Sequence, residues 1–153
     1  MLVKILKSIW ALSALFALFV LLYVYAALPE HVAYYYGELE ADISFIDREV
    51  MFYIMMAIIA ITNSVIYALA RKSALTMKKS RSVVARKITG WKYGLGITLN
   101  FFFLISMQFI NIFNSGEKYD YDNFGYLVYF SLGLVFVWIL SLPFVLFFSR
   151  MKV

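Results

Sequence analysis

The chain has 153 residues, 64% of them hydrophobic and only 15% charged, with a net charge of +5 and no cysteine. A small soluble domain cannot bury so large a share of apolar residues, so this composition excludes a soluble globular protein. The lack of cysteine excludes disulfides, thiol nucleophiles and zinc–thiolate sites. We therefore predict an all-α integral membrane protein, a single antiparallel helical bundle over residues 1–153.

Four apolar stretches are long enough to cross a bilayer, which takes about 20 residues of helix. None of the four contains a charged residue, so none offers the mid-membrane ionisable group that is typical of proton and ion carriers. The predicted spans are residues 9–28, 50–70, 93–113 and 124–148.

Charged residues are segregated along the chain. The N-terminus, the basic segment 71–92 and the C-terminus hold every base except Arg48 and Lys118, and they hold no acid. All 9 acids lie in the loops 29–49 and 114–123. By the positive-inside rule, we expect a protein of the plasma membrane, the inner membrane of a bacterium, with both termini and the basic segment in the cytoplasm and the acidic loops outside.

The first acidic loop contains the only histidine, a run of tyrosines and several acids. Its acids follow from an outer location, and its tyrosines are typical of an interfacial anchor or of a protein contact. One histidine without cysteine is poor material for a zinc site, and no calcium-loop spacing is present, so we predict neither a metal nor a cofactor. The predicted contact surface comprises Pro29, Glu30, His31, Tyr34, Tyr35, Tyr36 and Gly37.

Residues 37–45, GELEADISF, partly alternate between polar and apolar side chains. A period of two predicts a short extended segment, or one that lies on the bundle with its apolar side down.

Two predicted spans carry small or amide side chains along one face. Membrane helices associate through close packing and polar cross-links, because lipid tails are as apolar as leucine. An amide in hydrocarbon needs a partner, so these side chains either cross-link helices or line a polar pathway, and we expect cross-links. The predicted helix-packing residues are Ala57, Ala60, Asn63, Ser64, Ala68, Asn100, Gln108 and Asn111.

The basic segment 71–92 also carries Met77, Val84, Ile88 and Trp91 at helical spacing. It predicts either a helix held on the anionic lipid of the inner leaflet or a docking surface for an acidic partner. No nucleic-acid partner is expected, because no recognisable binding module accompanies the charge. Its bases are Arg71, Lys72, Lys78, Lys79, Arg81, Arg86, Lys87 and Lys92.

Aromatic residues lie near both predicted membrane interfaces. We expect Trp10, Trp91 and Tyr93 at the inner interface, where amphipathic rings prefer the headgroup zone.

Residues 22–59, LYVYAALPEHVAYYYGELEADISFIDREVMFYIMMAII, resemble the core of the SdpI-type membrane proteins. In that family a first span ends in Leu-Pro, and a short loop with an aromatic residue and a glycine leads to the second span. Members act in toxin immunity and membrane signalling without established enzymology, so the resemblance implies a binding role. The residues that fit the outline are Leu28, Pro29, Glu30, Val32, Tyr36 and Gly37.

The chain also departs from that outline. Ala33 stands where the family usually has a second proline, and Tyr35 stands where it usually has histidine or glutamine. Gly37 comes a residue or so early, and His31 does not fall on the family's histidine position. The resemblance covers about a quarter of the chain and does not extend into residues 70–153.

Three functions fit these observations, and none of them is enzymatic. The first is an accessory or assembly subunit that contacts other integral membrane subunits or itself, in a membrane with an anionic inner leaflet. The second is an SdpI-like immunity or signalling protein that senses through residues 27–49. The third is a small oligomeric transporter or channel. An enzyme is not expected, because general acid–base chemistry needs a titratable group held in a pocket, and the candidate groups all lie in short loops.

Overall fold

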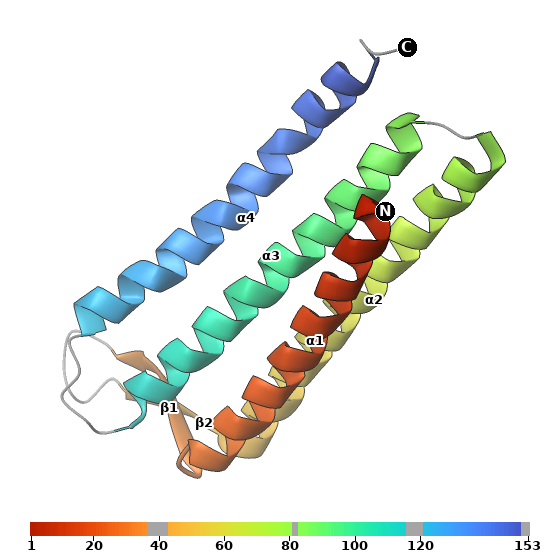
Figure 1. Cartoon of the computed structure of the whole chain (residues 1–153). Coiled ribbons are helices and arrows are strands. Elements are labelled where there is room, and N and C mark those ends of the chain that lie inside the picture. Colours follow the sequence, from red (N-terminus) through yellow and green to blue (C-terminus); the bar gives the residue numbers. More distant parts are fainter. Residues whose placement is uncertain (37–42, 81–82, 116–120, 151–153) are drawn as a thin grey trace.

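The computed structural model describes residues 1–36, 43–80, 83–115 and 121–150. Four of its helices are long and apolar enough to cross a membrane, which confirms the predicted all-α, four-span membrane fold (Figure 1). In chain order the elements are α1 (Leu2–Ala27), β1 (His31–Tyr36), β2 (Ile43–Asp47), α2 (Arg48–Ser80), α3 (Val83–Phe113) and α4 (Tyr121–Arg150).

The helices are longer than the predicted spans. α2 continues to Ser80 and α3 begins at Val83, so the basic segment is divided between the ends of two membrane helices. This arrangement differs from the single helix on the membrane surface that the spacing of apolar residues suggested, since that spacing falls on two separate helices.

Three helices share a core, and the fourth lies to one side. α1, α2 and α3 pack against one another, whereas α4 packs along α3 alone among the described helices (Figure 1). The core lies mainly between α1, α2 and α3 and includes Val32 of β1. Its buried members are Ala17, Val20, Leu21, Val24, Leu28, Val32, Ile59, Phe103 and Met107.

The two ends of the molecule differ in content. Figure 1 shows both termini at one end, together with the ends of α2 and α3 that meet at the basic segment. We call this the basic end. The strands lie at the opposite end, beside the junction of α3 and α4, and we call this the hairpin end.

α1 ends where the sequence places Pro29. Leu28 caps the helix in an extended conformation, with φ −74° and ψ 145°. The residue before a proline disfavours the helical region, so the end of the helix follows directly from the Leu-Pro pair.

β1 and β2 form an antiparallel two-stranded sheet, which we call the hairpin. His31 pairs with Asp47, Ala33 pairs with Phe45, and the register shifts between Ala33 and Tyr35. Of the predicted extended segment, residues 43–45 belong to β2, where Phe45 is exposed, and residues 37–42 lie outside the described residues. A lone two-stranded hairpin is marginally stable in water, so contacts with the bundle must hold it.

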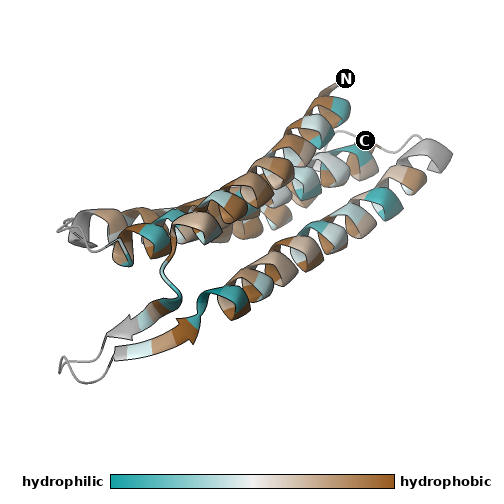
Figure 2. Ribbon diagram, turned by 90° about the horizontal axis from the view of Figure 1, so that it is seen from below, coloured by the Kyte–Doolittle hydropathy of each residue, from teal (hydrophilic) through white to brown (hydrophobic). Residues whose placement is uncertain are grey.

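Hydropathy follows this architecture. The helices are coloured mainly as hydrophobic, while hydrophilic residues gather where the hairpin joins α1 and α2 (Figure 2). Large apolar side chains remain exposed along every helix, as expected of surfaces that face lipid.

Two tryptophans attach α4 to α3. Trp91 Nε1 donates to the Trp138 carbonyl at 3.2 Å and to Ser141 Oγ at 2.9 Å, and Trp138 Nε1 donates to the Trp91 carbonyl at 3.0 Å. The Trp138 indole covers Gly94 so closely that a Cβ there would overlap the ring. The G-x-x-x-G pattern of Gly90 and Gly94 thus includes one site of close helix approach to α4.

Candidate functional site

Between α1, α2 and α3, four polar side chains form one hydrogen-bonded cluster, the amide cluster, which comprises Trp10, Ser13, Asn63 and Asn100. Asn63 Nδ2 donates to Asn100 Oδ1 at 2.8 Å, and Asn100 Nδ2 donates back to Asn63 Oδ1 at 3.1 Å. Trp10 Nε1 donates to Asn63 Oδ1 at 2.9 Å, and Asn100 Nδ2 also donates to Ser13 Oγ at 2.9 Å. The cluster therefore joins α1, α2 and α3.

The amide cluster is saturated. Asn63 places its second amide hydrogen on the Ile59 carbonyl at 2.9 Å, and Ser13 donates to the Trp10 carbonyl at 2.8 Å. Each amide nitrogen thus has two acceptors, and Asn100 is fully buried. Trp10, Ser13 and Asn63 are partly buried. A network whose amides are all paired stabilises a unique packing and leaves neither amide free to bind a solute.

The other two predicted amides behave differently. Gln108 and Asn111 are partly buried on α3, and neither side-chain amide bonds another residue in the part of the chain that the structure describes. The structure brings together Asn63 and Asn100 and leaves Gln108 and Asn111 outside the cluster.

The predicted small-residue face of α2 points away from the bundle. The buried face of α2 carries Ile59, Ile66 and Ala70, with Asn63 in the same row. The small residues lie on the other side of the helix and are exposed in the described structure, so the prediction that they pack against other helices of the bundle is wrong. Their role in contacts with other proteins stays a prediction. These exposed residues are Ala57, Ala60, Ser64 and Ala68.

At the hairpin end, one asparagine binds the edge of β1. Asn114 Oδ1 accepts from the Ala33 backbone N–H at 2.7 Å, and Asn114 Nδ2 donates to the Ala33 carbonyl at 3.1 Å. Asn114 Nδ2 also donates to the Ile110 carbonyl at 2.9 Å. The side chain therefore pairs with β1 as a neighbouring strand would, and fixes the hairpin to the end of α3.

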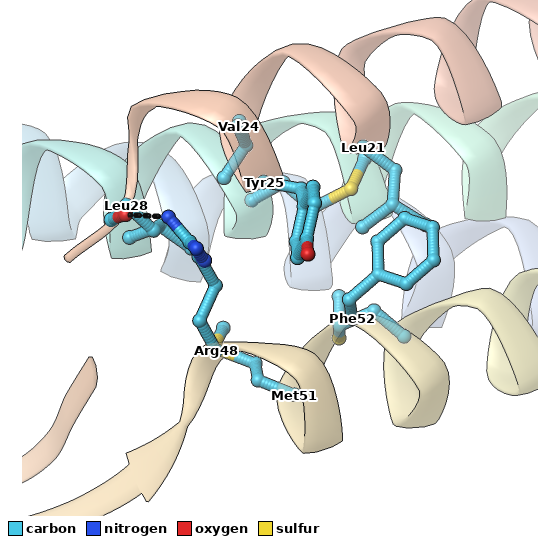
Figure 3. Close-up of a pocket in the computed structure, with 9 residues that line it drawn as sticks. Leu21, Val24, Tyr25, Leu28, Arg48, Met51 and Phe52 are labelled. Carbon is cyan, nitrogen blue, oxygen red and sulfur yellow. Dashed lines mark hydrogen bonds between the residues drawn. The ribbon is translucent and has the colours of Figure 1, made fainter. Parts of the chain in front are cut away.

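Arg48, the first residue of α2 after β2, joins the hairpin to the end of α1. Its guanidinium donates to the Leu28 carbonyl at 3.0 Å and lies 5.0 Å from the centre of the Tyr25 ring (Figure 3). Its backbone N–H donates to the Glu30 carbonyl at 2.9 Å. A cation on the last carbonyls of α1 also complements the negative end of the helix dipole.

The pocket beside Arg48 is a packing gap rather than a ligand site. Its volume is about 10 Å³, whereas pockets for small molecules occupy about 300–1,000 Å³. Figure 3 shows Leu21, Phe52 and Met51 closing it on the side away from the Leu28 carbonyl.

His31 and Asp47 face each other across the strands. His31 Nδ1 lies 3.1 Å from Asp47 Oδ1, and both side chains are mostly exposed, at 70% and 68%. An exposed pair of this kind contributes little to stability. Within the described ranges, no group of three or more acidic or histidine side chains is arranged to hold a metal ion.

The remaining predicted contact residues lie around this pair. Pro29, Glu30 and Tyr34 are exposed, and the backbones of Tyr35 and Tyr36 belong to β1. Phe45 of β2 adds a second exposed aromatic ring. Gly37 lies outside the described residues.

The bases of the segment 71–92 do not act alike. Lys92 Nζ donates to the Leu69 carbonyl at 2.9 Å and to Ser73 Oγ at 2.6 Å, so it links α3 to α2 instead of facing lipid headgroups. Arg71, Lys72 and Arg86 are exposed and Lys87 is partly exposed. Lys78 and Lys79 lie in the last turns of α2, and Arg81 lies outside the described residues.

Several residues that build these sites could not be identified from the sequence pattern. Trp10 was expected at the inner interface, but it bonds Asn63 and packs against Tyr67 and Tyr93, with ring centres 6.1 and 5.5 Å away. Ser13 interrupts an otherwise apolar stretch, and this interruption was the one feature of the sequence that pointed to it. Asn114 and Arg48 carried none, because their partners are backbone atoms of other elements.

Comparisons of the chain with protein-family models, curated proteins and solved structures found no match.

Proposed function

We propose that the chain is a non-enzymatic membrane protein that acts by contact with other membrane proteins, as an accessory or assembly subunit of a larger complex. The observation that carries this proposal is the anchored hairpin. Asn114 and Arg48 fix it to the bundle with side-chain bonds to backbone atoms, yet it leaves Tyr34 and Phe45 exposed at 64% and 57%. A rigid platform with exposed aromatic rings is typical of protein interfaces.

The amide cluster supports contact over transport. A transport pathway needs polar groups that meet water or a solute, whereas Asn63 and Asn100 bond each other, Trp10 and Ser13. The spans also lack the buried ionisable groups that carriers of protons and ions use.

The proposed location is the inner membrane of a bacterium, with the basic end in the cytoplasm. The support is the distribution of charge, because the basic end has Lys and Arg without acids and the hairpin end carries the acids. This orientation makes the hairpin an extracytoplasmic surface.

Co-purification tests the proposal. The tagged chain is expressed at its native level, extracted in mild detergent, and its associated proteins are identified by mass spectrometry. We expect one or more integral membrane proteins to be retained by the parent chain and lost from a Tyr34→Ala/Phe45→Ala variant. The matched control is Phe16→Ala/Phe19→Ala, which removes two exposed rings from α1. A lone monomer, or equal loss from both variants, would contradict the proposal.

An SdpI-like immunity or signalling role is the second candidate. The Leu28–Pro29 end of α1, followed by a short outer segment and a second span, agrees with the outline of that family. In that case, alanine at Pro29, His31 and Tyr34 abolishes the protective phenotype while expression stays normal. An unchanged phenotype would remove the hairpin from this role.

A further inference from the structure

A large groove opens at the basic end between α1, α3 and α4. Its volume is about 850 Å³, and it exists because α4 packs along α3 without packing along α1. Gly90 lies at its base, where a Cβ would meet Leu6 Cδ1 at 3.3 Å. Its lining includes Lys4, Arg86, Lys87, Gly90, Phe144 and Phe148.

The groove combines apolar walls with a cationic rim. The walls come from the first turns of α1 and from α4, where Phe144 and Phe148 are exposed at 64% and 57%. The cations are Lys4, Arg86 and Lys87. An amphipathic occupant, apolar along most of its length and anionic at one end, would complement both parts.

Among the described residues, no acid lies at the basic end beside these cations. The acids that the structure describes are Glu30, Asp47 and Glu49 around the hairpin and Asp122 in the first turn of α4, and all of these elements lie at the hairpin end. Unlike Lys92, which bonds α2, the three rim cations lie beside the groove. The anion that pairs with them therefore comes from outside the described residues.

The position of the groove selects the kind of anion. The apolar span of α4 ends at Phe148, so the groove lies where hydrocarbon gives way to the headgroup zone. Basic pockets between membrane helices at this level bind the phosphates of anionic lipids, while their apolar walls contact the acyl chains. A soluble anion would leave the apolar walls unused.

We propose that the groove between α1, α3 and α4 binds one anionic phospholipid, with its phosphate on Lys4, Arg86 and Lys87 and its acyl chain along Phe144. This site is independent of the hairpin and of the proposed contact function. The proposal places lipid recognition in one groove, whereas the sequence pattern alone attributed it to the whole basic segment 71–92.

Native mass spectrometry of the detergent-solubilised chain tests the site, with phosphatidylglycerol as the anionic lipid and phosphatidylcholine as the zwitterionic one. We expect one tightly retained phosphatidylglycerol per chain. Arg86→Gln/Lys87→Gln should weaken its binding about 30-fold, which equals about 2 kcal/mol at about 1.4 kcal/mol per tenfold. The control Arg71→Gln/Lys72→Gln makes the same charge change on the exposed side of α2 and should retain the lipid.

A second pair of variants tests the apolar wall without changing charge. Phe144→Ala should lower retention, whereas Phe136→Ala, an equally exposed ring on α4 outside the groove, should not. Equal binding of the two lipids would overturn the proposal, because the rim cations would then not select an anionic headgroup. Equal losses in the groove and control variants would overturn it in favour of general surface attraction. A dimer that forms in place of lipid binding and dissociates in Phe144→Ala would overturn it in favour of a second copy of the chain.

Discussion

Asn63 joins three helices through one side chain. It accepts from Trp10 of α1, exchanges hydrogen bonds with Asn100 of α3, and donates to the Ile59 carbonyl of its own helix. Removing the Asn63 side chain leaves the Trp10 indole N–H without its acceptor and the Asn100 amide without one of its partners. Leaving such polar groups unpaired in an apolar region costs free energy.

Asn63→Ala should therefore lower the free energy of unfolding by about 0.6–2 kcal/mol, the range for hydrogen bonds between membrane helices. Unfolding in an SDS titration measures the change. The double variant with Asn100→Ala should lose less than the sum of the two single variants, because each amide is the other's partner. Asn111→Ala is the control, since its amide bonds no other described residue. Additive losses would show that the two amides do not interact.

Gly94 sets how closely α4 approaches α3. A Cβ at this position overlaps the Trp138 indole, whereas a Cβ at Gly133 meets nothing within 4 Å. Gly94→Ala should lower stability by about 1–3 kcal/mol, the usual cost of overpacking. Gly133→Ala should be neutral or slightly stabilising. Thermal unfolding in detergent compares the two, and equal midpoints would contradict the close contact.

At the residue scale, sequence pattern identified Asn63 and Asn100 as groups that need partners but did not identify the partners. Trp10 is 53 positions from Asn63, and its indole was equally compatible with an interfacial anchor. A one-dimensional pattern shows which side chains cannot face lipid alone, while their pairing depends on how far each helix is rotated about its axis.

At the scale of elements, the hairpin is held by its contacts with the bundle as well as by the hydrogen bonds between β1 and β2. Val32 is fully buried in the bundle core, and the Asn114 side chain pairs with the Ala33 backbone in both directions. Each such bond contributes about 1 kcal/mol.

Asn114→Ala should therefore loosen β1 while leaving the helices intact. We expect the Ala33 amide to exchange its hydrogen about 10- to 30-fold faster, because two bonds are lost. Ser115→Ala is the matched neighbour, since its hydroxyl bonds only the nearby Ile112 carbonyl at 2.8 Å among described residues. Hydrogen–deuterium exchange with peptide resolution measures both, and equal exchange would contradict the anchoring role.

The elements were predictable to different degrees. The four spans could be predicted from the length of the apolar stretches, because about 20 consecutive apolar residues are typical of a membrane-spanning helix. β2 lies within a segment of partial alternation, but β1 reads HVAYYY and has no period of two. The helical extensions beyond the predicted spans, residues 71–80 of α2 and 83–92 of α3, mix bases with apolar residues, so apolar length alone did not include them.

At the scale of the whole molecule, the charge distribution predicts an orientation in the membrane, and this orientation can be measured. The chain has no cysteine, so single cysteines report directly on location. A membrane-impermeant maleimide applied to sealed spheroplasts should label Tyr34→Cys, whereas Lys72→Cys should react only after the membrane is opened. The reverse pattern would place the hairpin in the cytoplasm.

The groove, the hairpin and the outer face of α2 give the molecule three separate surfaces around one cross-linked core. Within that core region the amide cluster uses its hydrogen bonds internally, whereas the three surfaces carry exposed side chains. Of these surfaces, the hairpin is fixed to the bundle by the hydrogen bonds of Asn114 and Arg48.

Cross-linking from the hairpin in living cells tests the contact function most directly. Tyr34→Cys and Phe45→Cys carry a thiol-attached photoreactive group, and Ser8→Cys carries it at the basic end as the control. We predict that both hairpin positions yield an adduct with the same membrane protein at native expression, and that Ser8→Cys does not. Recovery of the uncross-linked chain from both hairpin positions, with the group attached and activated, would contradict the proposed function.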